Sequence, residues 1–346
     1  MKNAMNNDSQ VIVSKKERLH WLDYSKTIGM YLVVLGHVKD NTLLLKGIIY
    51  SFHMPLFFFL SGFLHKLRIG RGGKFCVSLV KQLVIPFFIF NGLTLLTKIK
   101  DIQTNGLIVT VYDFLKDFFE STFLGEPPVG PTWFILSLIW MKIIMFLLLK
   151  IREDFLSLLI IEIIWITALT LYYTLDFPQI PNYFHLGSSL LGFPFYLAGF
   201  LLKLKYKETV AWIKRKRWTI GLIFVFIIGF LFNGFASLEG CKVGNYILLM
   251  YLTGLCGTLL TIVSTHLLKR PNKWVYVLSC GMIVILCTHG FILNMTINKF
   301  PIFELYSWAW YIYAVISCII IMIIEIPIIL FCSRYFKWAM GGRKIF

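Results

Sequence analysis

The chain has 346 residues, of which 58% are hydrophobic, 17% aromatic and only 15% charged, and its mean hydropathy is +0.76. This composition excludes an ordinary soluble globular domain and indicates an integral membrane protein. A formal net charge of +17 is also typical of nucleic-acid-binding proteins, but the positions of the Lys and Arg residues argue against that class. Residues 1–17 are polar and are expected to form a flexible cytoplasmic N-terminal segment, followed by a single domain over 18–346.

Ten stretches are long and apolar enough to cross a bilayer as α-helices, because about 20 residues span about 30 Å of hydrocarbon. The predicted fold is therefore all-α, a polytopic bundle of about ten transmembrane helices. The first span is the least hydrophobic, because it contains Asp23, Lys26 and His37. The predicted spans are 21–38, 47–65, 77–97, 131–149, 155–174, 186–203, 218–235, 245–264, 277–297 and 308–331.

Lys and Arg residues are concentrated in alternate loops between these spans. The richest loop contains the "KRKR" run from Lys214 to Arg217, whereas the loops on the opposite side hold few basic residues. Because basic residues favour the cytoplasmic side, this asymmetry predicts that both termini are cytoplasmic, and it accounts for the net charge without nucleic acid. The seven cysteines form no CxxC pair, so neither a disulfide framework nor a metal site is predicted.

The first span keeps ionisable residues in the stretch "KTIGMYLVVLGH", Lys26 to His37. Such groups cost about 2.5–3.5 kcal/mol each at the centre of a membrane helix, so they mark candidate functional sites. Eleven residues at about 100° each fall within about 20° of three full turns, so Lys26 and His37 share a face, separated by a rise of about 16 Å. Asp23 lies close to that face and is expected to pair with Lys26.

This spacing suits one long anionic molecule better than a small substrate. Lys26 would hold the anionic part from the cytoplasmic side, and His37 would abstract a proton deeper in the membrane, a role that suits histidine near neutral pH. Two structural explanations stay open at this point. Lys26 can extend to the membrane surface, and His37 can hydrogen-bond a neighbouring helix.

Further candidates lie along the chain. His53, in "YSFHMPLFFFLSGFLHK", is predicted at a depth similar to the first histidine, and the "SG" pair of this stretch, Ser61 and Gly62, permits close helix approach. The following "HKLRIGRGGKF" contains Arg68 and Arg71. That basic segment is either a topology signal or a phosphate-binding cradle. Trp133, in "PTWFILSLIW", is expected near the outer interface, and His289, in "THGFILN", lies well inside the ninth span.

Five blocks resemble, in order, the signature blocks of the acyltransferase-3 membrane proteins, in particular the fucose 4-O-acetylase-like branch. They are "LDYSKTIGMYLVVLGH", "FHMPLFFFLSGFL", "GPTWFILSLIW", "FPFYLAGFLLK" and "NGFASLEGCKVGN", and they cover nearly the whole chain. The first block is the most specific, because a basic residue eleven positions before the histidine of "GH" is typical of the family. Many members have arginine where this chain has Lys26, which keeps the charge but not the bidentate geometry toward phosphate.

The resemblance implies a multi-pass O-acetyltransferase of the bacterial cytoplasmic membrane. It would move an acetyl group from cytoplasmic acetyl-CoA to a sugar hydroxyl of a surface polysaccharide or its lipid-linked precursor, with no metal. On that basis His37 would be the catalytic base and Lys26 its basic partner. The candidate site comprises His37, Lys26 and Asp23 for catalysis, Lys26, Arg68, Arg71 and Lys81 for the cofactor, and His53, Trp133 and His289 for the acceptor.

Two other functions remain compatible with the sequence. An exporter or flippase of a glycan or small organic anion would also need a polar path through ten helices, although the sequence shows no internal repeat of the kind common in transporters. A structural membrane subunit of a glycan-assembly complex is the third possibility. Binding of acetyl-CoA would distinguish the enzyme from the exporter.

Overall fold

The computed structural model describes residues 18–39, 42–66, 72–206, 216–268, 270–299, 302–342 and 345, so the predicted flexible segment 1–17 lies outside the described residues. The protein is all-α, and the described residues contain one isolated antiparallel bridge, between Ser237 and Lys242. The elements are α1 (His20–Gly36), α2 (Leu43–Phe63), α3 (Gly72–Leu79), η2 (Val80–Val84), α4 (Ile85–Gly92), η3 (Leu93–Lys98), α5 (Ile99–Asn105), α6 (Leu107–Leu124), η4 (Gly130–Thr132), α7 (Trp133–Ile151), α8 (Phe155–Thr174), η5 (Tyr183–His185), α9 (Leu186–Leu204), α11 (Lys216–Asn233), α12 (Ile247–His266), α13 (Lys273–Cys280), α14 (Met282–Met295) and α15 (Trp308–Tyr335).

Seven helices among the described residues are long and apolar enough to cross a membrane, or eight if α13 and α14 together form one span. The protein is therefore a multi-pass membrane protein with seven to eight candidate spans, fewer than the ten predicted. The two remaining predicted spans are helical, but they do not meet the length and polarity expected of a membrane span. Helix α1 has 17 residues and includes Asp23 and Lys26, and the apolar part of α11 covers only Trp218–Asn233.

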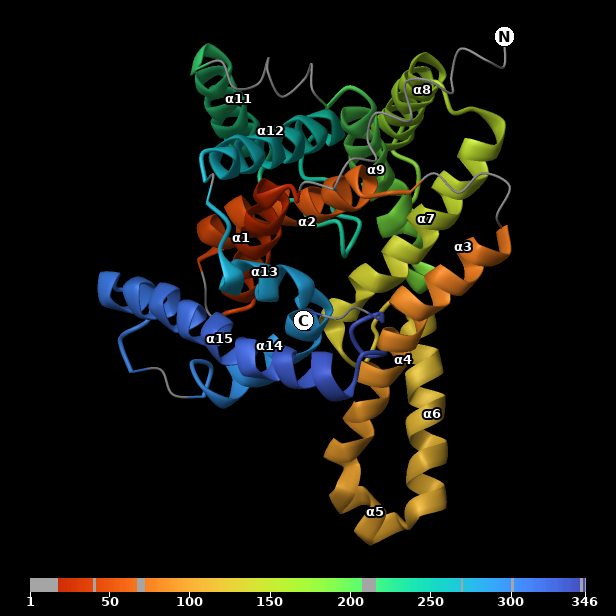
Figure 1. Ribbon diagram of the computed structural model, residues 1–346, viewed down its shortest axis with the longest axis vertical. Helices are drawn as coiled ribbons and strands as arrows, with labels where there is room; N and C mark the ends of the chain where they lie inside the picture. Colours follow the sequence, from red (N-terminus) through yellow and green to blue (C-terminus); the bar gives the residue numbers. More distant parts are fainter. Residues whose placement is uncertain are drawn as a thin grey trace.

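Two segments differ from the sequence prediction. The ninth span, predicted as one helix over 277–297, is broken between α13 and α14, which meet at 84°. The break falls at Gly281, where a Cβ atom would lie 2.4 Å from the Ile329 side chain of α15. The segment between the predicted spans 77–97 and 131–149 contains α5 and α6, which extend away from the rest of the molecule as an arm (Figure 1). The charged residues of this segment lower its mean hydropathy, but they do not prevent helix formation.

Helix α2 is the centre of the packing, since it contacts α1, α9 and α12. Its contact with α9 is close because each helix carries a glycine at the crossing point. A Cβ atom at Gly62 would lie 1.8 Å from the carbonyl oxygen of Tyr196, and one at Gly199 would lie 1.9 Å from that of Phe59. The "SG" pair in the second span therefore permits close helix approach, as the sequence indicated.

Helix α1 lies beside α2 and also contacts α12, α13, α14 and α15. Figure 1 shows α1 and α2 in the interior, with α7 and the α3–α4 segment on one side and α13–α15 on the other. Ten of the 17 residues of α1 are buried, including the polar Asp23 and Ser25. Its polar residues therefore face other helices, where the candidate site is found.

Candidate functional site

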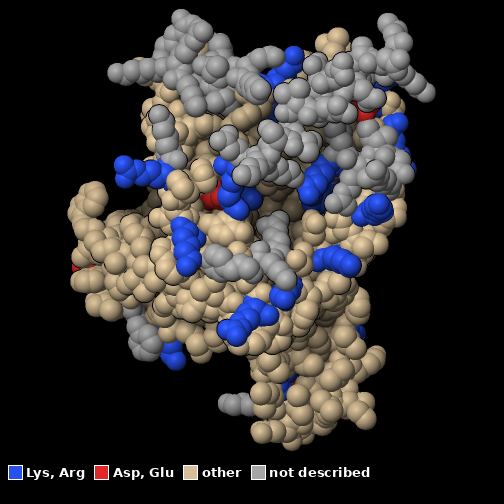
Figure 2. Space-filling view, in the orientation of Figure 1, with Lys and Arg blue, Asp and Glu red and all other residues tan. Residues whose placement is uncertain are grey.

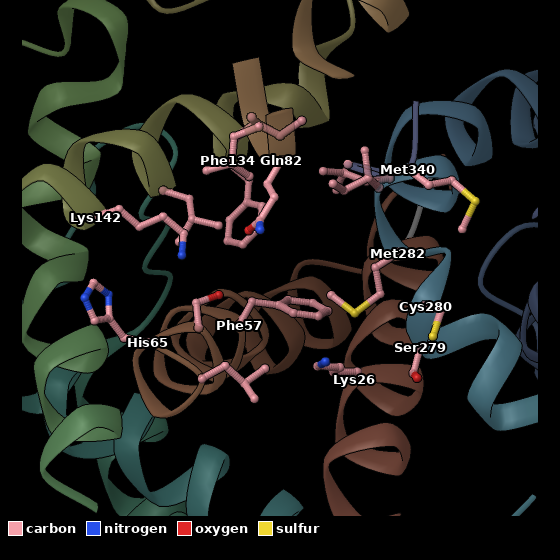
Figure 3. Close-up of a pocket in the computed structure, with 18 of the residues that line it drawn as sticks. Lys26, Phe57, His65, Gln82, Phe134, Lys142, Ser279, Cys280, Met282 and Met340 are labelled. Carbon is pink, nitrogen blue, oxygen red and sulfur yellow. The ribbon is translucent and has the colours of Figure 1, made fainter. Parts of the chain in front are cut away.

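A cavity of about 560 Å³, called the basic cavity below, lies between α1, α2, α3, α7, α13 and α14. Four cationic side chains line it, and none of its described lining residues is Asp or Glu; the four are Arg18, Lys26, Lys66 and Lys142. Figure 3 shows Lys26 and Lys142 extending into the cavity from different walls. Lys and Arg side chains also gather around a hollow on the face of the molecule in Figure 2. The cavity is therefore suited to an anionic ligand.

The rest of the basic cavity is largely apolar. Phe57, Phe134 and Met282 line it, together with Val33 and Leu286 at its deeper end (Figure 3). An elongated ligand with an anionic head and an apolar arm matches both parts of this wall. The volume lies within the range of about 300–1,000 Å³ typical of cofactor pockets.

Asp23 forms its ion pair with Arg18, and it also interacts electrostatically with Lys26, the partner expected from the sequence. The Arg18 guanidinium donates to both carboxylate oxygens, with distances of 2.6 Å from Nε and 2.9 Å from Nη2. The Ser279 hydroxyl donates to the same carboxylate at 2.7 Å. These hydrogen bonds to Asp23 raise the pKa of Arg18 above its usual value. Asp23 therefore joins the start of α1 to α13 at the edge of the basic cavity.

A second, smaller pocket of about 20 Å³, called the histidine pocket below, lies further along α1. His37 of α1 and His53 and Tyr50 of α2 line it, together with Trp133 at the start of α7 and Glu239 from the turn between α11 and α12. Trp133 is only 4% exposed. It is therefore a buried wall residue of this pocket, and its expected place near the outer interface stays a prediction.

The two cavities share part of their walls. Four residues, called the barrier residues below, line both of them: Val33, Met54, Phe134 and Leu286. Along α1, Lys26 and Met30 line the basic cavity, Val33 lines both, and His37 lines the histidine pocket. These positions follow the helical spacing i, i+4, i+7 and i+11, so one face of α1 runs from one cavity to the other.

The histidines share one hydrogen-bonding arrangement. The Nδ1 atoms of His37, His53 and His289 lie 2.8, 2.7 and 2.7 Å from the carbonyl oxygens of Val33, Ile49 and Ile285, respectively. A carbonyl oxygen only accepts, so each Nδ1 carries the proton and donates it. Each Nε2 atom therefore has a lone pair available, as a general base requires.

His289 lies behind His37 and lines neither cavity. It is fully buried, its ring centroid is 5.0 Å from that of His37 in an edge-to-face arrangement, and its Nε2 has no hydrogen-bond partner among the described residues. This position lets His289 support the orientation of the His37 ring. Contact with a ligand in the histidine pocket would require a rearrangement.

The remaining predicted cofactor residues are not part of the described cavity wall. Arg68 and Arg71 lie outside the described residues. Lys81, in η2, is exposed, and its helical neighbours Ser78 and Gln82 line the basic cavity instead. The proposed contacts of these three residues with the cofactor therefore stay predictions.

Four residues of the two cavities were not singled out for these roles from the sequence. From the sequence, Lys142 is explained as a snorkelling or structurally paired residue and Arg18 as a topology signal. Lys66 belongs to the basic segment that was interpreted as either a topology signal or a phosphate-binding cradle. Among these residues, Lys142 could have been identified as a candidate site residue from the sequence, because it is a cation inside the fourth predicted span. Glu239 lies in the quoted block "NGFASLEGCKVGN", but its distance of about 200 residues from His37 in the chain conceals their proximity.

No group of three or more His, Cys, Asp or Glu residues among those described could hold a metal ion. Comparison with curated proteins and with solved structures gave no match. A family model described as an acyltransferase domain, Acyl_transf_3, matches residues 19–327. This match covers most of the chain, including the whole histidine pocket and all of the basic-cavity wall except Arg18, Met340 and Gly341. The chain therefore belongs to the acyltransferase-3 family of membrane transferases, which move an acyl group from a donor to an acceptor.

Proposed function

We propose that the protein is an O-acetyltransferase of the fucose 4-O-acetylase-like branch. It would use acetyl-CoA as the donor and a sugar hydroxyl of a surface polysaccharide, or of its lipid-linked precursor, as the acceptor. The observation that carries this proposal is the placement of Lys26 and His37 on one face of α1, in two cavities that share a wall. Family membership supports the acyl transfer itself.

The basic cavity is the proposed donor site. Lys26, Lys66 and Lys142 supply positive charge for the phosphates of acetyl-CoA, and the apolar wall accommodates its extended arm. Arg18 shares its charge with Asp23 and so contributes less to the net field. Lys81, Arg68 and Arg71 remain candidates for the part of the cofactor outside the cavity.

The histidine pocket is the proposed acceptor site. His37 Nε2 takes the proton of the sugar hydroxyl as that oxygen attacks the acetyl carbonyl carbon. A carbon–oxygen bond forms, the carbon–sulfur bond of the thioester breaks, and the proton passes to the departing thiolate. His53 and Trp133 form acceptor-binding walls, and the barrier residues separate the acceptor from the rest of the cofactor.

The proposed orientation places the donor site toward the cytoplasm, with both termini on that side and ten crossings in a bacterial cytoplasmic membrane. The crossings beyond the seven to eight candidate spans would be α1 and α11. A 17-residue helix is about 26 Å long, so α1 would require a slightly thinned bilayer. Reporter fusions at Phe346 and within 203–217 should both give cytoplasmic signals, and an external signal at either would contradict this topology.

The decisive test of the activity uses the purified full-length chain, [acetyl-¹⁴C]acetyl-CoA and de-O-acetylated envelope polysaccharide from cells that carry the protein. We expect saturable acetyl-CoA binding and transfer of the label to the polysaccharide. If acetyl-CoA neither binds nor donates its acetyl group, the exporter becomes the better hypothesis. Mass spectrometry of the polysaccharide from cells with and without the protein would then identify the acetylated sugar.

A further inference from the structure

The turn between α11 and α12 is held in a fixed conformation. Ser237 and Lys242 exchange two backbone hydrogen bonds, of 2.8 and 2.9 Å. Cys241 has a φ of 54°, a left-handed conformation that a non-glycine residue seldom adopts without support from its surroundings. Asn233 closes the base of the turn, because its side chain donates to Val243 O at 2.9 Å and accepts from Tyr246 N at 2.8 Å.

Residues from outside the turn fix the backbone at its tip. Asn182 Nδ2 and Ser188 Oγ donate to the carbonyl oxygen of Glu239, at 2.8 and 3.0 Å. Gln179 Nε2 donates to the carbonyl oxygen of Gly240 at 2.8 Å. The main chain at Glu239 is therefore positioned by several independent contacts before any ligand binds. Such prior positioning reduces the entropy lost on binding.

The Glu239 side chain extends from this fixed backbone into the histidine pocket. It lines the pocket with His37, His53 and Tyr50, and it interacts electrostatically with Tyr50. No described residue donates a hydrogen bond to its carboxylate. Burial raises the pKa of Glu239 above its usual value. The Glu239 residue is partly buried, and its carboxylate is available to accept hydrogen bonds from a ligand in the pocket.

The chemistry of the pocket indicates the class of that ligand. Three of its polar groups are hydrogen-bond acceptors: the carboxylate of Glu239 and the Nε2 atoms of His37 and His53. Tyr50 and Ser237 add hydroxyls that can donate or accept, and Trp133 adds an indole N–H that donates. Such a pocket requires a ligand that brings several O–H donors on an otherwise compact body. Neighbouring hydroxyls at one edge of a sugar ring meet this requirement, and the pocket, at about 20 Å³, must widen to admit them.

We propose that Glu239 is an acceptor-binding residue, whose carboxylate accepts hydrogen bonds from two hydroxyls of the acceptor sugar while a third hydroxyl is directed at His37 Nε2. This inference rests on the proposed function. Glu239 neither gains nor loses a proton in the transfer, and it forms no covalent bond. Its contribution is to select a polyhydroxyl acceptor and fix which oxygen reaches the acetyl carbonyl carbon.

The test compares the wild-type protein with Glu239→Gln and Glu239→Asp, in detergent, with labelled acetyl-CoA and the de-O-acetylated envelope polysaccharide as the acceptor. Glu239→Gln should raise the KM for polysaccharide about 10-fold or more, as expected for loss of charge-assisted hydrogen bonds. Glu239→Asp keeps the carboxylate and should recover part of the loss. Acetyl-CoA affinity should remain within about two-fold of wild type in both variants, because Glu239 does not line the basic cavity.

Glu126→Gln is the matched control, because Glu126 is exposed and lines neither cavity. It should leave all these values unchanged. An unchanged KM for polysaccharide in Glu239→Gln, or equal losses in the Gln and Asp variants, would overturn the assignment of Glu239 alone. Failure of the wild-type protein to acetylate the polysaccharide would instead overturn the proposed function, and this inference with it.

Discussion

Lys26 and His37 extend from one face of α1 into two different cavities, which meet at Val33 between them. The helical rise places their Cα atoms about 16 Å apart. A molecule held at Lys26 must therefore pass the barrier residues before its far end reaches His37. The residues proposed to hold the donor and the residue proposed to act on it therefore lie in separate cavities, so the two groups can be tested separately.

Lys142 and Lys26 should contribute to donor affinity, since both line the basic cavity. Lys142→Ala and Lys26→Ala should each weaken acetyl-CoA binding by about 10- to 100-fold, the range expected for a charge-assisted hydrogen bond. Lys26→Arg keeps the charge and should retain much of the affinity. Isothermal titration calorimetry on the purified chain provides the measurement. The exposed Lys39, which lines neither cavity, is the control, and wild-type affinity in Lys142→Ala would remove that residue from the donor site.

The barrier residues should limit the length of the acyl group. Phe134→Leu shortens a side chain that lines both cavities, and it should raise kcat/KM for butyryl-CoA relative to acetyl-CoA by about 10-fold, because pocket size discriminates weakly per methylene. Phe58→Leu is the control, since Phe58 stacks on Phe134 with centroids 5.2 Å apart but lines neither cavity. A butyryl preference that changes equally in both variants would assign the effect to general loosening of the core.

The Asp23 carboxylate should stabilise the junction between α1 and α13. Asp23→Asn removes the charge that Arg18 pairs with and weakens the hydrogen bond from Ser279. We expect the thermal midpoint to fall by at least about 2 °C and acetyl-CoA affinity to fall by about 3- to 10-fold through the displaced cavity edge. Asp101→Asn is the control, because Asp101 pairs with Lys98 on the surface, where both side chains are about half exposed. Equal behaviour of the two variants would contradict a structural role for Asp23.

Glu239 should make stability depend on pH in a defined direction. Its pKa is raised by burial above the usual 4.5, so above that pH the unfolded chain releases the proton more readily than the folded protein. Folding is therefore increasingly disfavoured as pH rises through this window. Glu239→Gln removes the penalty, so its thermal midpoint should match wild type near pH 4 and exceed it at pH 8. A midpoint difference that is the same at both pH values would contradict the burial of this carboxylate.

The sequence predicted the features that depend on local periodicity. The spacing of Lys26 and His37 placed them on one helix face without reference to any other part of the chain. The hydropathy pattern located a helix at each of the ten predicted spans, although only seven to eight of them meet the length and polarity expected of a membrane span. The "SG" pair likewise predicted a close helix contact.

The features that depend on distant residues were not predictable in this way. Asp23 was assigned to Lys26 because they lie three residues apart, whereas its ion-pair partner precedes α1 and its other donor, Ser279, is 256 residues away. The bend at Gly281 lies against Ile329 of another helix, where a side chain at position 281 would have no room. Glu239 and His37 line the same pocket only because the turn between α11 and α12 brings Glu239 to it. Tertiary packing, which a single sequence does not display, decides each of these.

We propose that His37 acts on the acyl group of a donor that other residues hold. Measuring both acetyl transfer to the de-O-acetylated polysaccharide and acetyl-CoA binding on His37→Ala tests this role. We expect affinity within about two-fold of wild type and a transfer rate lower by about 10²–10⁴-fold, as expected when a general base is removed. His20→Ala, on the same helix but outside both cavities, should retain full transfer. A His37→Ala protein of normal abundance that acetylates the polysaccharide at the wild-type rate would rule out this role for His37.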